Sequence, residues 1–156
     1  QFYIIGGGLN FKKFQETCQS KQLTTITFIP SIPKKDMPSV ISQADVCLAT
    51  LKDIPLFSTV YPNKVFDYMA AKKPTILAIN GVIKDVIDTS QGGQSVPPEN
   101  PTAMKEAILF YYKNPDACIE QGNHAYQYVK HNFNRKKIAK ALESYFLSAI
   151  KEDSHV

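Results

Sequence analysis

The stretch of sequence that decides the fold reads PNKVFDYMAAKKPTILAI and occupies residues 62–79. Its first part carries apolar side chains at the spacing of one helical face: Val65, Phe66, Met69 and Ala70. Pro62 is suited to begin this helix, because the N–H that proline lacks has no helical partner in the first turn. After Lys72-Lys73, the segment Pro74–Ile79 is short and apolar, as a buried strand is. A helix followed directly by a buried strand predicts an α/β fold.

The same alternation extends toward both ends of the chain. Strands are expected at Phe2–Ile5, Thr25–Ile29, Asp45–Ala49, Pro74–Ile79 and Gln94–Val96. Helices are expected from Phe11 to about Ser20, over Lys35–Ala44, from Pro62 to Lys72-Lys73, around Val82–Ile87, from Pro101 through Leu109, from Pro115 to about Lys130 and over Arg135–Lys151. Thr50–Tyr61 has no clean period and indicates a loop. This order predicts a Rossmann-like, doubly wound parallel sheet with helices on both faces, in one domain over residues 1–156.

Composition narrows the function classes. Hydrophobic residues make up 44% of the chain, which is enough for one core and argues against a disordered protein. The net charge of +4 suits an anionic ligand or membrane surface. Because no dense basic block interleaves with aromatic residues, no nucleic-acid partner is expected. No apolar run reaches the roughly 18 residues of a membrane span, and no signal peptide is visible.

The chain offers no evident catalytic or metal constellation. Its three cysteines (Cys18, Cys47 and Cys118) are widely spaced, which indicates reduced thiols in a cytoplasmic protein. The three histidines have no carboxylates at metal-ligand spacing, so no metal ion is expected. Late aromatic residues at helical spacing are expected to pack in the core: Tyr111, Tyr112, Tyr126, Tyr128, Phe133, Tyr145 and Phe146.

In an open parallel sheet, ligands bind beyond the carboxyl ends of the strands. The first such loop is Gly6-Gly7-Gly8, where Gly7 and Gly8 either line a cleft or only make a tight turn. A dinucleotide fingerprint would need another glycine where Phe11 stands, so it is absent. The second loop holds Pro30 and Ile32, which either form an apolar ledge for a flat base or simply end a strand. Turn chemistry alone explains Asn80-Gly81.

The start of the helix at Pro62 is the clearest candidate anion site. The amides of Asn63, Lys64 and Val65 lack helical acceptors and lie at the positive end of the helix dipole. Lys64 adds a full positive charge, and the combination suits a diphosphate. Asp67 follows one turn later, where a carboxylate could accept hydrogen bonds from both ribose hydroxyls. The alternative is a helix with a surface Lys64–Asp67 pair worth a few tenths of a kcal/mol.

The ordered set of motifs resembles the C-terminal domain of the large retaining glycosyltransferase family with the GT-B fold (family 4, group 1). The matching pieces, which together cover nearly the whole chain, are YIIGGG at 3–8, ITFIP at 26–30, ADV at 44–46, PNKVFDYMAA at 62–71, GG at 92–93 with PPENP at 97–101, and NFNR at 132–135. The segment at 62–71 is similar to the "P-S-K-x-x-E-Y-M-A" variant of bacterial surface-polysaccharide transferases.

The resemblance implies a domain that holds a nucleotide diphosphate sugar without a metal ion or another cofactor. By position, Asp67 would bind the ribose hydroxyls, and the amides of Asn63 and Lys64 would hold the diphosphate. Pro30 and Ile32 would border the base. The full enzyme would transfer the sugar, with retention, to a polysaccharide or lipid-linked oligosaccharide such as O-antigen or capsule. UDP is the favoured nucleotide, with GDP as the alternative.

Departures from the family pattern are also informative. The family's Glu-x7-Glu motif would place acids at positions 59 and 67, where this chain has Thr59 and the shorter Asp67. The family's basic pair for the diphosphate lies before Gly6, and the acceptor site and catalytic histidine belong to an N-terminal domain. Because the chain opens at Gln1 in mid-strand without Met, we expect a fragment of a two-domain enzyme that is inactive alone.

Two other functions remain open from the sequence. A nucleotide-sugar epimerase shares the two-domain architecture, but it would carry more carboxylates for proton chemistry. A non-catalytic interaction domain of receiver type would have paired acids after its first strand, where this chain has glycines. We expect a cytoplasmic transferase with peripheral association at the inner face of the cell membrane.

Overall fold

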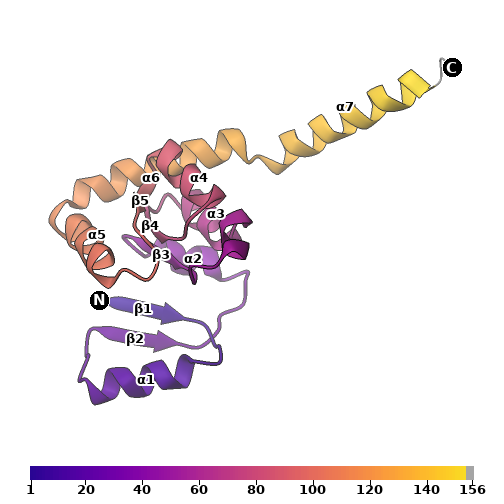
Figure 1. Cartoon of the computed structure of the whole chain (residues 1–156). Coiled ribbons are helices and arrows are strands. Elements are labelled where there is room, and N and C mark those ends of the chain that lie inside the picture. The colour runs from indigo at the N-terminus through magenta and orange to yellow at the C-terminus, as the bar shows by residue number, and fades with distance from the viewer. Residues whose placement is uncertain (154–156) are drawn as a thin grey trace. The chain divides into compact units, whose positions relative to one another are not determined.

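The computed structural model describes residues 1–153. Strands alternate with helices along the chain, as expected (Figure 1). The elements are β1 (Phe2–Ile5), α1 (Phe11–Ser20), β2 (Ile26–Ile29), α2 (Met37–Ser42), β3 (Cys47–Thr50), the 3-10 helix η1 (Pro55–Thr59), α3 (Asn63–Ala70), β4 (Thr75–Ala78), α4 (Val82–Ser90), β5 (Gly93–Ser95), α5 (Pro101–Lys113), α6 (Pro115–Asn132) and α7 (Arg135–Asp153). The chain divides into two compact units, Gln1–Val40 and the part from Ile41 onward.

The first unit is a pair of parallel strands with one helix. β1 pairs with β2 in a register that sets Phe2 opposite Ile26. α1 lies along β2 (Figure 1), and the ring of Phe11 meets that of Phe28 edge-on at 5.5 Å. Phe11 and Phe28 therefore hold helix and sheet together through apolar contact.

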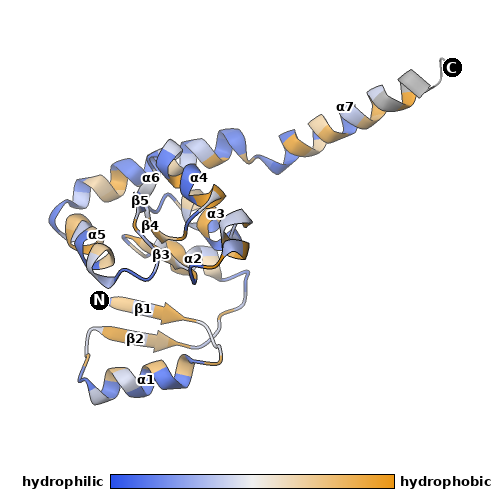
Figure 2. Cartoon of the chain, viewed as in Figure 1, coloured by the Kyte–Doolittle hydropathy of each residue, from blue (hydrophilic) through white to orange (hydrophobic). Residues whose placement is uncertain are grey.

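The second unit holds the main core, around the central strand β4. β4 pairs in parallel with β3 on one side and with β5 on the other. All four of its residues are buried, as expected for a parallel strand that is covered on both faces. Figure 2 shows the apolar residues gathered on these strands and on the inward sides of the helices around them.

Alternate residues of β4 pack into two different apolar clusters. Leu77 belongs to one cluster with residues of β3, α3, α4 and α6: Ala49, Val65, Met69, Ile79, Ile83, Val86, Ile87 and Ala125. Ile76 belongs to the other cluster, with Ala107 and Tyr111 of α5. Because neighbouring strand residues point to opposite faces, the helices cover both faces of this sheet. The predicted fold class, a Rossmann-like α/β fold with parallel strands, is confirmed.

The expected elements are all present, and their bounds differ by a few residues. The largest difference lies at the end of α5, which runs to Lys113 rather than Leu109. α3 begins at Asn63 rather than Pro62 and ends at Ala70 rather than Lys72-Lys73. Lys72 has a φ of +59°, in the left-handed region, so the helix cannot continue through it. The expected loop at Thr50–Tyr61 contains the 3-10 helix η1.

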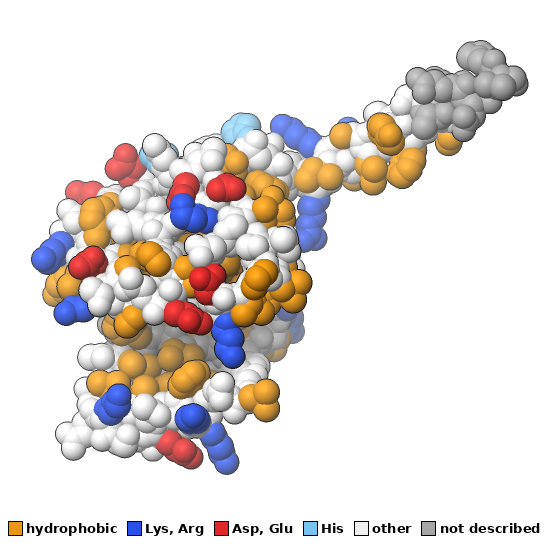
Figure 3. All heavy atoms as spheres, in the orientation of Figure 1, with side chains coloured by type: hydrophobic (Ala, Val, Ile, Leu, Met, Phe, Trp, Pro, Cys, Tyr) orange, Lys and Arg blue, Asp and Glu red, His pale blue; other side chains and the backbone are white. Residues whose placement is uncertain are grey.

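The prediction that the late aromatic residues pack in the core is wrong for three of them. Tyr111 is 4% exposed, whereas its neighbour Tyr112 is 82% exposed, because consecutive helical residues face different directions. Tyr145 and Phe146 of α7 are 70% and 56% exposed. They belong to a row of apolar side chains on α7 (Figure 3) that also includes Ile138 and Leu142. No helix within residues 1–153 is long and apolar enough to cross a membrane.

Candidate functional site

The N-terminus of α3 presents two free backbone donors. Pro62 is the N-cap residue, with an extended ψ of 119°, and no side chain caps the helix. The N–H of Val65 donates to the carbonyl oxygen of Pro62 at 3.0 Å. The prediction of three free amides is therefore corrected, because this tight first turn occupies Val65 and leaves those of Asn63 and Lys64. Such amides point outward at the positive end of the helix dipole, where a bound anion is favoured.

The side chain of Lys64, the residue that carries one of these donors, is half-buried. Burial lowers the pKa of its ammonium group. Among the side chains that the structure describes, the only ion pair is the one between Lys84 and Asp88, so the surface pair considered for Lys64 and Asp67 does not form. A cation at a helix N-terminus is also repelled by the dipole. Lys64 thus places a partly desolvated, uncompensated positive charge in the first turn of α3, directly after Asn63.

Asp67 is exposed and lies one turn further along α3. Its backbone carbonyl accepts a hydrogen bond from the N–H of Ala71 at 3.1 Å, as in a regular helix end. No hydrogen bond to its carboxylate is found in the described part of the chain, so both oxygens are open to solvent. The carboxylate is available to accept hydroxyl donors from a ligand at the start of the helix.

Two contacts join the loop after β3 to the loop after β4. Asn80 donates through its side-chain amide to a carboxylate oxygen of Asp53 at 3.2 Å. Gly81 has a φ of +89°, and a Cβ there would lie 1.9 Å from the carbonyl oxygen of Ser58 in η1. The prediction that turn chemistry alone explains Asn80-Gly81 is therefore incomplete, because Gly81 also meets the backbone of η1 and Asn80 bonds to Asp53. Glycine suits both the positive φ and the close approach.

Thr59 stands where the resemblance would place a first glutamate. It is exposed, and its hydroxyl donates to the carbonyl oxygen of Leu56 at 3.0 Å within η1. The hydroxyl therefore supports the 3-10 turn, and the position carries no negative charge.

The remaining candidate residues belong to the first unit. Gly6 has a φ of +147° and donates its N–H to the carbonyl oxygen of Ile29 at 3.1 Å. A Cβ on Gly7 would lie 3.3 Å from the Ser31 hydroxyl, so the glycine turn runs beside the segment that contains Pro30 and Ile32. Gly8 has no atom within 4 Å of a Cβ position. Pro30 is exposed and Ile32 is half-buried.

The structure therefore groups the candidate residues into two sets. Gly7 and Gly8 lie with Pro30 and Ile32 in the first unit, and the residues at the start of α3 lie in the second. No group of three or more His, Cys, Asp or Glu that could hold a metal ion occurs among the side chains that the structure describes.

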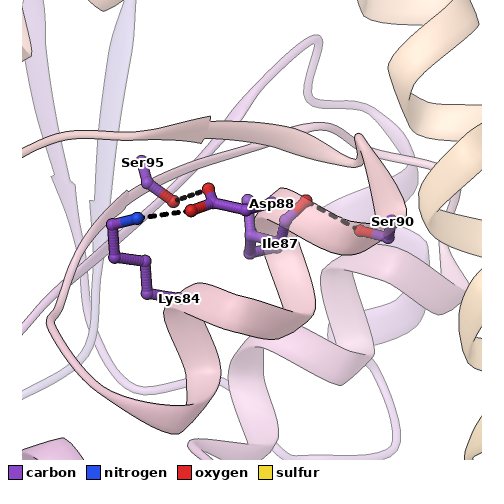
Figure 4. A network of polar contacts seen from close by, with 5 residues as sticks. All are labelled: Lys84, Ile87, Asp88, Ser90 and Ser95. Carbon is purple, nitrogen blue, oxygen red and sulfur yellow. Dashed lines mark hydrogen bonds and ion pairs between the residues drawn. The ribbon is translucent and has the colours of Figure 1, made fainter.

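A polar network links α4 to β5 (Figure 4). The Lys84 ammonium pairs with the Asp88 carboxylate, whose other oxygen accepts a hydrogen bond from the Ser95 hydroxyl at 2.6 Å. Burial alone would raise the pKa of Asp88, but the hydrogen bonds from Lys84 and Ser95 outweigh it and hold that pKa below its ordinary value. All charges here are compensated, so the network favours a stabilising role.

Sequence reasoning missed an aromatic cluster next to the start of α3. Tyr61 and Phe66 meet each other at 6.1 Å between ring centroids, and Phe133 meets both. The NFNR motif, which contains Phe133, was the sequence feature that could have pointed to this cluster. Helical spacing placed Phe66 and Phe133 in the core without indicating that they would meet, and Tyr61 was assigned to a loop.

A comparison with protein families matches residues 1–114 to the model described as "Glycosyl transferases group 1". This range is well over half of the chain and extends across both units. A search of curated proteins finds no match.

Solved structures share the fold at low sequence identity. A sucrose-phosphate synthase from Thermosynechococcus elongatus has 21% identity and a TM-score of 0.82, over 97% of this chain and 39% of its own. Anabaena Alr3699/HepE in complex with UDP has 16% identity and a TM-score of 0.77, over 91% of this chain and 40% of its own. A mutant of S. aureus TarM, in complex with fondaparinux, alpha-GlcNAc-glycerol and UDP, has 17% identity and a TM-score of 0.76, over 94% of this chain and 29% of its own. The chain thus spans between about three tenths and two fifths of the length of these proteins.

Proposed function

The chain belongs to the group 1 glycosyl transferases, and on this premise we propose that it is the C-terminal, donor-binding domain of a retaining two-domain transferase. Its ligand is a nucleotide diphosphate sugar, with UDP favoured. The full enzyme passes the sugar to a polysaccharide or lipid-linked oligosaccharide in the synthesis of a bacterial surface polysaccharide. It works in the cytoplasm, at the periphery of the membrane.

One observation carries this proposal: Lys64, in the same first turn of α3 as the free amides of Asn63 and Lys64, has a half-buried side chain with no carboxylate partner in the described part of the chain. An uncompensated cation at the positive end of a helix is unfavourable when no anion is bound. A diphosphate reverses the sign of that interaction, because it supplies negative charge and accepts the free N–H groups. UDP in the HepE and TarM complexes is consistent with a ligand of this class.

The neighbouring residues have complementary roles in this proposal. The exposed Asp67 carboxylate accepts hydrogen bonds from the two ribose hydroxyls. The roles of Gly7 and Gly8 in close approach to the donor, and of Pro30 and Ile32 at the edge of the base, stay predictions from the resemblance. Thr59 adds no carboxylate, so any contact of the donor sugar with this position is made by a neutral group.

The chemistry that follows is electrostatic. When the bond between sugar and diphosphate breaks, negative charge grows on the leaving diphosphate. Donors that are already fixed in place stabilise that charge with no further rearrangement, which lowers the barrier. In this proposal the amides of Asn63 and Lys64 and the Lys64 ammonium perform this task, and no metal ion takes part.

Calorimetric titration with UDP and with GDP, both in EDTA, tests this function. We expect UDP to bind the wild-type chain and Asp67→Ala to abolish or strongly weaken that binding. A preference for GDP would keep the family and change the base. If neither nucleotide binds the chain, nor a longer form that includes both domains, the donor-binding role is wrong.

A further inference from the structure

The start of α3 has few local interactions that hold it in place. No side chain caps the helix, and its first turn contains no acidic residue. A side-chain cap commonly contributes about 1 kcal/mol to the stability of a helix end, and an acidic residue in the first turn contributes about 0.3–1 kcal/mol. The positive charge of Lys64 acts in the opposite direction. The position of this turn must therefore depend on packing against other parts of the second unit.

An aromatic pair across the helix start supplies the first part of that packing. Tyr61 directly precedes the N-cap residue Pro62, and Phe66 is the fourth residue of α3. Their ring centroids lie 6.1 Å apart. An apolar contact between these two positions is a hydrophobic staple, which fixes the angle at which the chain enters a helix.

Phe133 contacts both members of this staple. Its ring centroid lies 4.8 Å from that of Phe66 and 6.4 Å from that of Tyr61, and Tyr128 flanks it at 6.2 Å. Phe66, Tyr128 and Phe133 all pack against the main core cluster, whereas Tyr61 is 51% exposed. Phe133 is therefore the link between the core and the exposed ring at the entrance to α3.

The backbone around Phe133 is held on both sides. Its N–H donates to the carbonyl oxygen of Val129 at 2.9 Å, which ends α6. The next residue, Asn134, accepts hydrogen bonds at its side-chain oxygen from the N–H groups of Lys136 and Lys137, which begin α7. A ring between two capped helix ends has a well-defined position.

From these contacts we infer that Phe133 is a positioning residue for the donor-binding turn, one that acts on the Asn63 and Lys64 amides through the Tyr61–Phe66 staple. This inference rests on the proposed function for its consequence in binding. Its structural part, the control of the first turn of α3, stands on the ring contacts alone.

The test compares Phe133→Leu, which removes the ring, with Phe133→Tyr, which keeps it. Phe110→Leu is the matched control, because Phe110 is a partly exposed phenylalanine of α5 that pairs with Tyr111 instead. Without nucleotide, we expect amide hydrogen exchange at Val65, the first hydrogen-bonded amide of α3, to accelerate in Phe133→Leu relative to the core strand β4. Phe133→Tyr and Phe110→Leu should retain the wild-type ratio.

With UDP, we expect Phe133→Leu to bind about three- to tenfold more weakly, which is the scale of a single aromatic pair, because only its contacts with the Tyr61–Phe66 staple bear on the turn. Phe133→Tyr should restore the affinity, and Phe110→Leu should keep it even if its melting temperature falls. Tyr61→Leu disturbs the staple from its exposed side, so it serves if Phe133→Leu does not fold. Wild-type exchange at Val65 in the ring-removing variants would overturn the inference. If the wild type binds no nucleotide, the proposed function fails, and the exchange data alone decide on Phe133.

Discussion

Gly81 and Ser58 approach each other so closely that a Cβ on Gly81 would lie 1.9 Å from the Ser58 carbonyl oxygen. The contact joins the loop after β4 to η1 in the loop after β3. Both loops leave the carboxyl ends of their strands, which is the side of a parallel sheet where ligands bind. The shape of this edge in the second unit thus depends on a position without a side chain.

Gly81→Ala should destabilise the protein by about 2–4 kcal/mol, because it adds a backbone clash to an unfavourable positive φ of +89°. Urea unfolding measures this change. Gly8→Ala is the control, since no atom lies within 4 Å of its Cβ position, and it should cost much less. Equal losses in the two variants would contradict the steric argument.

Lys64→Met should stabilise the protein without nucleotide and weaken nucleotide binding. Removing a cation from the positive end of α3 is worth about 0.5 kcal/mol, and losing a charged partner of the diphosphate costs about tenfold or more in affinity. Thermal unfolding and calorimetry with UDP give the two values. Lys113→Met is the control, because Lys113 lies in the last turn of α5, where the dipole favours a cation. It should lose a little stability and keep its affinity.

The lowered pKa of Lys64 also predicts how stability changes with pH. The unfolded chain binds this proton more tightly than the folded chain, so the free energy of unfolding rises as pH increases from the lowered pKa toward 10.5. Below the lowered pKa the cost of burying the charge is fully present. The difference between wild type and Lys64→Met should therefore shrink over this alkaline range. A constant difference in urea titrations across the range would refute the prediction.

Cys47 should react slowly with thiol reagents in the folded protein. Burial raises the pKa of its thiol to about 11, and the nearby Lys73 offsets this only in part. Because the thiolate is the reactive form, little of it exists near neutral pH. Mass-spectrometric mapping of alkylation under mildly alkaline conditions should find Cys18, which is half-buried, modified before Cys47. Addition of urea should abolish the difference, whereas early modification of Cys47 would show that β3 opens readily.

Asp88 should contribute to acid sensitivity. Its pKa is lowered in the folded state, so its stabilising effect is present above the ordinary value of 3.8 and is lost as pH falls through the lowered pKa. Asp88→Asn should flatten the fall in stability at low pH, measured by unfolding at a series of acidic pH values. An acid profile of Asp88→Asn that matches the wild type would contradict this prediction.

The order and type of the elements could be predicted from the sequence because they depend on local periodicity. The apolar face of α3 and the short run of β4 each lie within a few consecutive residues. The ends of the helices were harder to predict where the conformation of the capping residue sets them. Pro62 was expected inside the helix, yet its extended backbone makes it the N-cap residue, and the number of free amides fell from three to two.

The candidate anion site also followed largely from the sequence, since a helix start with a lysine is a local feature. Its electrostatic state did not, because the exposure of Lys64 and the absence of a pair with Asp67 among the described residues depend on how α3 packs in the second unit. The burial of the late aromatic residues was equally beyond local reasoning. Helical spacing is the same for Tyr111, which lies in the core, and for Tyr145, which is exposed.

The residues 62–79 thus determined by themselves that a helix with a cationic N-terminus leads into a buried parallel strand, because hydrophobic period and backbone chemistry act over a few residues. Only the tertiary structure decided that Phe133 meets the Tyr61–Phe66 staple and that Gly81 touches η1. Such contacts join residues from different elements, and the packing that brings them together is set by the shape of the whole core rather than by any local pattern.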